Sequence, residues 1–143
     1  MLRIQHSVTV PRPPERVWAV FQDLPGWPKW NPATPSATWL TEGQWRRGAR
    51  MQLTLRLKGR RMTVRSEVVT IEPNRRVTWV GRRLGVVERH SFTFEADGDG
   101  TRVTTVETFS GPLLFLVRLL MSPTRLQAML VQWLEALRAK AQR

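Results

Sequence analysis

Residues 86–110, VVERHSFTFEADGDGTRVTTVETFS, decide the fold, because they form two alternating runs joined by a tight turn. Apolar and polar residues alternate along both runs, which is the period of a β-strand. The stretch between them, Asp97–Gly100, reads Asp-Gly-Asp-Gly and is a strong hairpin signal. The segment therefore predicts two antiparallel strands whose turn sets which residues face each other.

The turn pairs Ala96 with Thr101, and three further pairs follow from it: Phe94 with Val103, Phe92 with Thr105, and His90 with Glu107. Because successive side chains on a strand point to opposite faces, all of these residues share one face. The apolar members identify it as the inner face. Opposed Cβ atoms lie about 4.5–5.5 Å apart, so we expect His90 and Glu107 within hydrogen-bond reach of each other.

The rest of the chain continues this pattern. Residues 3–10 alternate as a strand, residues 14–22 are helical, and a short helix fits residues 27–30. Alternating runs separated by turns predict five or six antiparallel strands in total after the helices. The turn at Gly59–Arg60 pairs Leu57 with Met62, and Trp79 comes to lie near Val68. Residues 113–121 are helical, and Ser122-Pro123 begins a longer helix that ends near residue 141.

These elements predict an α+β fold over one domain, residues 1–143. A curved antiparallel sheet wraps around the long C-terminal helix, and two short helices follow the first strand. The apolar stripe of the long helix, which includes Leu126 and Leu130, covers the inner face of the sheet. Since a bent sheet and one helix fill each other's space poorly, we expect an apolar cavity between them, with His90 and Glu107 pointing into it.

Composition excludes several classes of function. The 143 residues include no Cys, no Tyr and only two His, which excludes disulfides, thiolate zinc sites, phenolic acid–base chemistry and sites with several His ligands. We therefore expect no metal and no cofactor. The N-terminus lacks the apolar run of a signal peptide. The longest apolar run, residues 113–121, is interrupted by Arg118 and falls short of the about 20 residues of a membrane span. These features predict a soluble, cytoplasmic protein.

The net charge of +12 comes mainly from arginine. We expect most of these arginines in turns or on outward strand positions, as a solvated basic surface: Arg46, Arg47, Arg50, Arg56, Arg60, Arg61, Arg65, Arg75, Arg76, Arg82, Arg83 and Arg89. Nucleic acid is a poor fit, because the arginines form neither a helical stripe nor a tract interleaved with aromatic residues. Weak association with an anionic carrier, membrane surface or acidic ligand stays open.

Several local motifs resemble one known superfamily. They are Pro14-Glu15-Arg16-Val17-Trp18, Trp27-x-x-Trp30-Asn31-Pro32, Glu72-Pro73-x-Arg75, Trp79-x-Gly81, Gly100-Thr101-Arg102-Val103, and Glu88-Arg89-His90-x-Phe92 with Glu107-x-Phe109-x-Gly111. With the order of elements, they resemble the START/SRPBCC (helix-grip) superfamily, in its polyketide cyclase/dehydrase and lipid-transport-like group of small bacterial proteins. The resemblance covers nearly the whole chain and implies an apolar ligand beneath the long helix. It implies no single catalytic signature.

The resulting hypothesis is a domain that binds a hydrophobic small molecule, lipid-like or polyketide-like, as a monomer or homodimer. The residues expected to contact it are Trp30, Asn31, Leu53, Leu55, Val68, Trp79, His90, Phe92, Thr105, Glu107, Leu126 and Leu130. Trp30 and Asn31 are first of all turn residues, with a gate as the alternative. His6 is assigned to packing.

Two other functions stay open. One is a cyclase- or dehydratase-type enzyme in which His90 is the general base and Glu107 orients it. The other is a basic interaction module in which the arginine surface binds an anionic partner.

Overall fold

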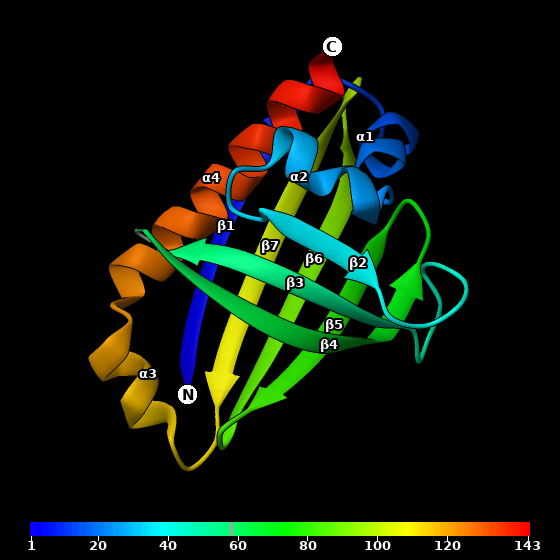
Figure 1. Ribbon diagram of the computed structural model, residues 1–143. Helices are drawn as coiled ribbons and strands as arrows, with labels where there is room; N and C mark the ends of the chain where they lie inside the picture. Colours follow the sequence, from blue (N-terminus) through cyan, green and yellow to red (C-terminus); the bar gives the residue numbers. More distant parts are fainter. Residues whose placement is uncertain (58) are drawn as a thin grey trace.

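The alternating segments form one antiparallel sheet in the computed structural model, which describes residues 1–57 and 59–143. Its strand order is β1-β7-β6-β5-β4-β3-β2. The strands are β1 (Leu2–Val10), β2 (Ser36–Trp39), β3 (Arg50–Leu57), β4 (Arg60–Glu72), β5 (Arg76–Arg83), β6 (Val86–Asp97) and β7 (Gly100–Ser110). The sheet curves, and the helices lie along its concave side (Figure 1).

The helices occupy the segments with helical spacing. They are α1 (Pro14–Phe21), the 3-10 turn η1 (Leu24–Gly26), α2 (Trp27–Trp30), α3 (Leu114–Leu120) and α4 (Pro123–Gln142). Helices α1 and α2 lie beside the C-terminal end of α4, whereas α3 lies at the opposite end of the molecule (Figure 1). This arrangement confirms the predicted helix-grip fold. The short strand β2, which pairs with β3, carries too weak an alternation to have been predicted.

The register of the β6–β7 hairpin is the predicted one, with Phe92 opposite Thr105 and His90 opposite Glu107. The predicted β3–β4 register is wrong by two residues, because Leu57 pairs with Arg60 and Leu55 with Met62. The paired part of the two strands therefore extends closer to the reversal than predicted, and residue 58 lies outside the described residues. A shift of two preserves the faces. Leu53 and Leu55 are therefore buried as expected.

Helix α4 covers the inner face of the sheet. The Ser122 side chain accepts a hydrogen bond from the backbone N–H of Arg125 and caps the helix, as Ser122-Pro123 predicted. The buried stripe of α4 packs mainly against β1 and α1. The stripe consists of Leu126, Met129, Leu130, Trp133, Leu134, Leu137 and Ala141.

Aromatic side chains fill the interior near α1 and α2. Phe21 lies at the centre of this cluster, with ring centroids 4.8 Å from Phe92 and 5.1 Å from Trp27. Trp133 of α4 reaches Trp27 at 5.3 Å, edge to face. Trp79 lies 5.5 Å from Phe92. Aromatic side chains therefore fill the space between the sheet and the helices at the end where α1 and α2 lie.

The short helix α3 contrasts with α4. Val117 is its only buried residue, and four of its large apolar side chains are exposed: Phe115, Leu116, Leu119 and Leu120. Within residues 1–57 and 59–143 no single helix is both long and apolar enough to cross a membrane; α3 and α4 reach that limit only taken together, and they are bent by 79°.

Truncating the α4 stripe should destabilise the protein far more than truncating α3. Leu130→Ala removes a fully buried side chain and should lower the free energy of unfolding by about 2–5 kcal/mol. Leu119→Ala, at a side chain that is 76% exposed, should change it by no more than about 0.5 kcal/mol. Urea denaturation measures both, and equal losses would contradict the assignment of α4 as the core helix.

Candidate functional site

Three ionisable side chains meet inside the sheet. Glu88 and His90 lie two residues apart on β6, so both point to the inner face, and Glu107 lies opposite His90 on β7. His90 Nδ1 is 3.4 Å from Glu107 Oε2. All three side chains are buried. We refer to Glu88, His90 and Glu107 as the inner cluster.

A hydrogen-bond chain sets the tautomer of His90. The Thr105 hydroxyl lies 3.1 Å from the Ser91 carbonyl oxygen and donates to it, because a carbonyl only accepts. This hydrogen bond uses the single proton of the hydroxyl. His90 Nε2 lies 2.8 Å from Thr105 Oγ1, so in this second hydrogen bond Nε2 is the donor and Oγ1 the acceptor. Nδ1 then carries no proton, and its lone pair faces Glu107.

Burial governs the ionisation of the inner cluster. It lowers the pKa of His90 to about 3, so the imidazole is neutral near pH 7. Burial also raises the pKa of Glu107 well above its usual value, and the neighbouring Glu88 carboxylate raises it further. The pKa of Glu88 is raised by burial as well. A positive charge or a bound proton is therefore strongly favoured among these groups.

The residue types of the inner cluster also suit a metal ion. One ligand atom from each of Glu88, His90 and Glu107 lies within 4.8 Å of the other two. Carboxylate oxygen and imidazole nitrogen are common ligands of divalent ions. The cluster can therefore hold either a shared proton or a single cation.

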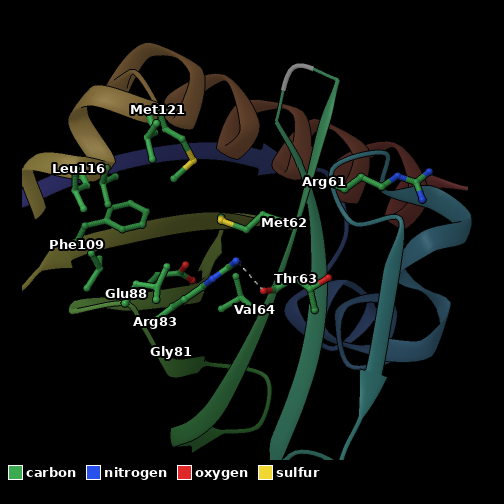
Figure 2. Close-up of a pocket in the computed structure, with 14 residues that line it drawn as sticks. Arg61, Met62, Thr63, Val64, Gly81, Arg83, Glu88, Phe109, Leu116 and Met121 are labelled. Carbon is green, nitrogen blue, oxygen red and sulfur yellow. Dashed lines mark hydrogen bonds between the residues drawn. The ribbon is translucent and has the colours of Figure 1, made fainter. Parts of the chain in front are cut away.

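A cavity of about 490 Å³ lies next to the inner cluster, between the sheet and α3. Figure 2 shows Met62, Phe109 and Met121 around it, with Glu88 and Arg83 close together at one side and Arg61 extending away. The complete lining is Arg61, Met62, Thr63, Val64, Gly81, Arg83, Leu84, Val86, Glu88, Phe109, Leu116, Val117, Leu120 and Met121. Glu88 is the single member of the inner cluster that reaches it.

None of the residues predicted for the site lines this cavity. His90, Thr105 and Glu107 come together as the register predicted. Trp79 and Phe92 pack against the His90 ring, at centroid distances of 5.0 Å and 4.8 Å. The aliphatic members belong to the buried core: Leu53, Leu55, Val68, Leu126 and Leu130.

Trp30 and Asn31 lie at the far end, beside α2. The Asn31 side-chain oxygen accepts a hydrogen bond from the backbone N–H of Ala33, as expected of a turn residue, and Trp30 packs against the core. His6 pairs with Thr105 across β1 and β7. The twelve arginines expected on the surface are all exposed.

Glu88 is a candidate site residue that the sequence prediction missed. The alternation that placed His90 on the inner face also places Glu88 there, two residues earlier, so the signal was present. The α3 residues of the cavity wall, such as Val117 and Leu120, had no comparable signal. Their apolar run indicated a helix but not the part of the sheet that it covers.

Comparisons with known proteins agree with this geometry. The sequence profile of the polyketide cyclase/dehydrase and lipid transport family matches residues 1–142. No functionally curated protein matches the chain.

Solved structures share the fold at low sequence identity. The protein TTHA0849 from Thermus thermophilus is 21% identical, with a TM-score of 0.81, and the match covers 98% of this chain and 97% of that one. The Zhui aromatase/cyclase from a Streptomyces species is 23% identical, with a TM-score of 0.71 and coverages of 99% and 94%. A START superfamily protein from Mycobacterium smegmatis is 17% identical, with a TM-score of 0.68 and coverages of 97% and 92%.

The neutral state of His90 predicts a pH dependence of stability. Its pKa falls from 6.5 to about 3 on folding, so its stabilising contribution is complete above pH 6.5 and is lost as the pH falls towards 3. In chelator-treated protein, the wild type should lose up to about 1.4 kcal/mol per pH unit relative to His90→Gln across that window. Urea denaturation at several pH values measures this difference, and parallel curves would contradict a neutral His90.

Glu107 supplies a control of opposite sign. Because its pKa is raised above 4.5 on folding, its contribution is complete below pH 4.5 and is lost as the pH rises through the raised value. Glu107→Gln should therefore gain stability relative to the wild type as the pH rises above 4.5.

Proposed function

Because this chain belongs to the polyketide cyclase/dehydrase and lipid transport family, we propose that it binds a hydrophobic small molecule in the cavity beneath α3. The observation that carries the proposal is this cavity of about 490 Å³, walled mainly by aliphatic, Met and Phe side chains. Its volume lies within the range typical of small-molecule sites, about 300–1,000 Å³. Each apolar group of a ligand that is buried there contributes about 1.5–3 kcal/mol, so tight binding requires no cofactor.

Polar groups on one side of the cavity give the ligand an orientation. Glu88 and Arg83 both line the cavity, and the Arg83 guanidinium also donates to the Thr63 carbonyl oxygen at 3.2 Å. A hydroxyl or carbonyl group of the ligand would bind at this side. His90 and Glu107 act from behind Glu88, as the groups that hold its carboxyl in place.

The predicted residues contribute as the support of the cavity rather than as its lining. In this proposal Trp79 and Phe92 hold the His90 ring, and Thr105 fixes its tautomer. The core leucines and Val68 keep the sheet and α4 in position. Trp30 and Asn31 serve the turn at the opposite end.

Catalysis of a cyclase or dehydratase type is the alternative at the same site. In this geometry His90 does not reach the cavity, so a proton would pass between substrate and His90 through Glu88. Glu88→Gln would then abolish turnover of an added substrate while its binding stays near normal. In a carrier the same substitution would weaken binding only modestly.

An anionic lipid surface is a second candidate partner, because the cavity mouth carries exposed apolar side chains. Leucines and a phenylalanine stand out from α3 and from the turn between β5 and β6, with exposures of 77% for Leu84, 56% for Phe115, 76% for Leu119 and 72% for Leu120. Side chains of this kind partition into the interface of a bilayer. We call these four residues the apolar rim.

Charge favours a lipid surface over a second copy of the chain. Arg118 of α3 is exposed, as are Arg82 and Arg83, the last two residues of β5 before the turn; residues 82–85 and 114–120 contain no acidic residue. Two copies meeting at this surface would bring like charges together, whereas anionic headgroups would attract them. A ligand could then pass from the bilayer directly into the cavity.

Filling the cavity should abolish ligand binding without unfolding the protein. Val117→Trp places an indole into the cavity wall and should weaken binding of the apolar dye N-phenylnaphthylamine by about tenfold or more, which corresponds to about 1.4 kcal/mol. Dye fluorescence measures the affinity, and native mass spectrometry of purified protein shows whether a bound lipid is lost.

The matched control is Phe115→Trp, on the same helix but outside the cavity lining. It should bind the dye as the wild type does. Wild-type protein that binds neither dye nor co-purified lipid would overturn the proposed function.

Charge on the apolar rim should prevent association with vesicles. The double variant Leu119→Asp/Leu120→Asp should lose co-sedimentation with phosphatidylglycerol-containing vesicles, and wild-type binding should decrease as salt is raised. Leu40→Asp, at an exposed leucine elsewhere, should bind as the wild type does. If the wild type dimerises through the rim, size-exclusion chromatography will show a dimer that the double variant lacks, and the lipid assignment fails.

A further inference from the structure

The inner cluster places two carboxyl groups close together in the interior of the protein. Glu88 and Glu107 are two carboxyl groups, and within the described residues neither forms an ion pair with an arginine or lysine. Glu107 is 0% exposed, and its two buried oxygens have no hydrogen-bond partner apart from the neighbouring Glu88 carboxyl. An unpaired buried carboxylate is strongly unfavourable. Either a proton shared by these carboxyl groups or a cation bound between them would remove this cost.

The imidazole presents a lone pair to the same place. Because His90 Nε2 donates to Thr105 Oγ1, whose own proton goes to the Ser91 carbonyl, the unprotonated Nδ1 faces Glu107. An imidazole that is held through one nitrogen and free at the other is the arrangement of metal-binding histidines. A lone pair and a carboxylate that face each other repel unless a cation or a proton lies between them.

The separation between the two groups distinguishes these possibilities. His90 Nδ1 and Glu107 Oε2 are 3.4 Å apart. Charge-assisted hydrogen bonds are shorter, about 2.7–2.9 Å. Two ligands bound to one tetrahedral ion at about 2.1 Å are about 3.4 Å apart. The separation of His90 and Glu107 therefore fits two ligands of one ion better than a direct hydrogen bond between these two groups.

Glu88 supplies a third ligand from the cavity side. Its carboxylate lies within 4.8 Å of the other two ligand atoms, and the residue also lines the cavity. Because Glu88 lines the cavity, an ion held by these three side chains would lie beside the cavity. Three protein ligands and one open position are typical of zinc sites that bind water or a ligand oxygen.

We propose that Glu88, His90 and Glu107 bind one divalent transition-metal ion, of which Zn²⁺ is the representative. Its two positive charges balance the two carboxylates, and His90 Nδ1 completes the set of protein ligands. This proposal departs from the expectation of no metal, because the count of histidines and cysteines excludes sites with several His or thiolate ligands but not a site with one His and two carboxylates. The proposed metal site depends only on the inner cluster, so it does not require that the cavity bind a hydrophobic molecule.

Metal titration of the whole chain tests the site directly. Protein dialysed against a chelator should bind one Zn²⁺ per chain in isothermal titration calorimetry. Co²⁺ should give the visible absorption of a four-coordinate ion in competition with Zn²⁺. Neither measurement needs a hydrophobic ligand, so failure here is distinct from failure of the dye experiment.

Three variants assign the binding to these residues. Glu107→Gln keeps the shape of the side chain and should weaken Zn²⁺ binding by at least about 100-fold, and Thr105→Val, which frees the imidazole, by about 10–100-fold. Glu95→Gln, at an exposed carboxylate on β6, should leave the affinity unchanged. Circular dichroism confirms that each variant is folded.

Two results would overturn the proposal. One is the absence of stoichiometric Zn²⁺ and Co²⁺ binding to folded wild-type protein, in which case a proton balances the cluster. The other is Zn²⁺ binding that Glu107→Gln leaves unchanged, which would place the ion elsewhere on the chain.

Discussion

The β6–β7 hairpin imposes the constraint on which the rest of the molecule depends. Its register points Glu88, His90 and Glu107 to the same face as Phe92 and the other apolar residues of the two strands. Polar groups that require partners are thus placed in an interior that offers few. The hydrogen-bond chain through Thr105 meets part of this requirement. What remains is a buried acidic cluster beside a cavity, and the proposed chemistry of the protein begins there.

The interior divides into a filled part and a hollow part. Phe21, Trp27, Trp79 and Trp133 occupy the space beneath α1 and α2, where the curvature of the sheet alone would predict a cavity. At the other end, within residues 1–57 and 59–143, the sheet faces α3, which is short and contributes one buried side chain. The cavity lies there because fewer large side chains enter that space, although the sheet continues across both ends.

The fold was largely predictable because alternation and turn chemistry are local. The Asp-Gly-Asp-Gly turn fixed the His90–Glu107 pair, and Ser122-Pro123 fixed the start of α4. The β3–β4 register was less constrained, since its turn has no comparable motif, and the error of two residues left the faces unchanged. The location of the cavity was not predictable, because it depends on how side chains such as Trp27 and Trp133 pack. Glu88 followed from the same alternation as His90, but its position at the cavity did not.

Helices α3 and α4 have different roles: α4 packs into the core, and α3 lines the cavity. Helix α4 supplies seven buried residues to the core, whereas α3 supplies Val117 alone, and yet α3 forms one wall of the cavity. Substitutions along α3 can therefore change the size and polarity of the cavity with little penalty to folding. In evolutionary terms, the cavity can diverge among related sequences while the scaffold stays the same. Low sequence identity combined with a shared fold is the expected outcome of such a division.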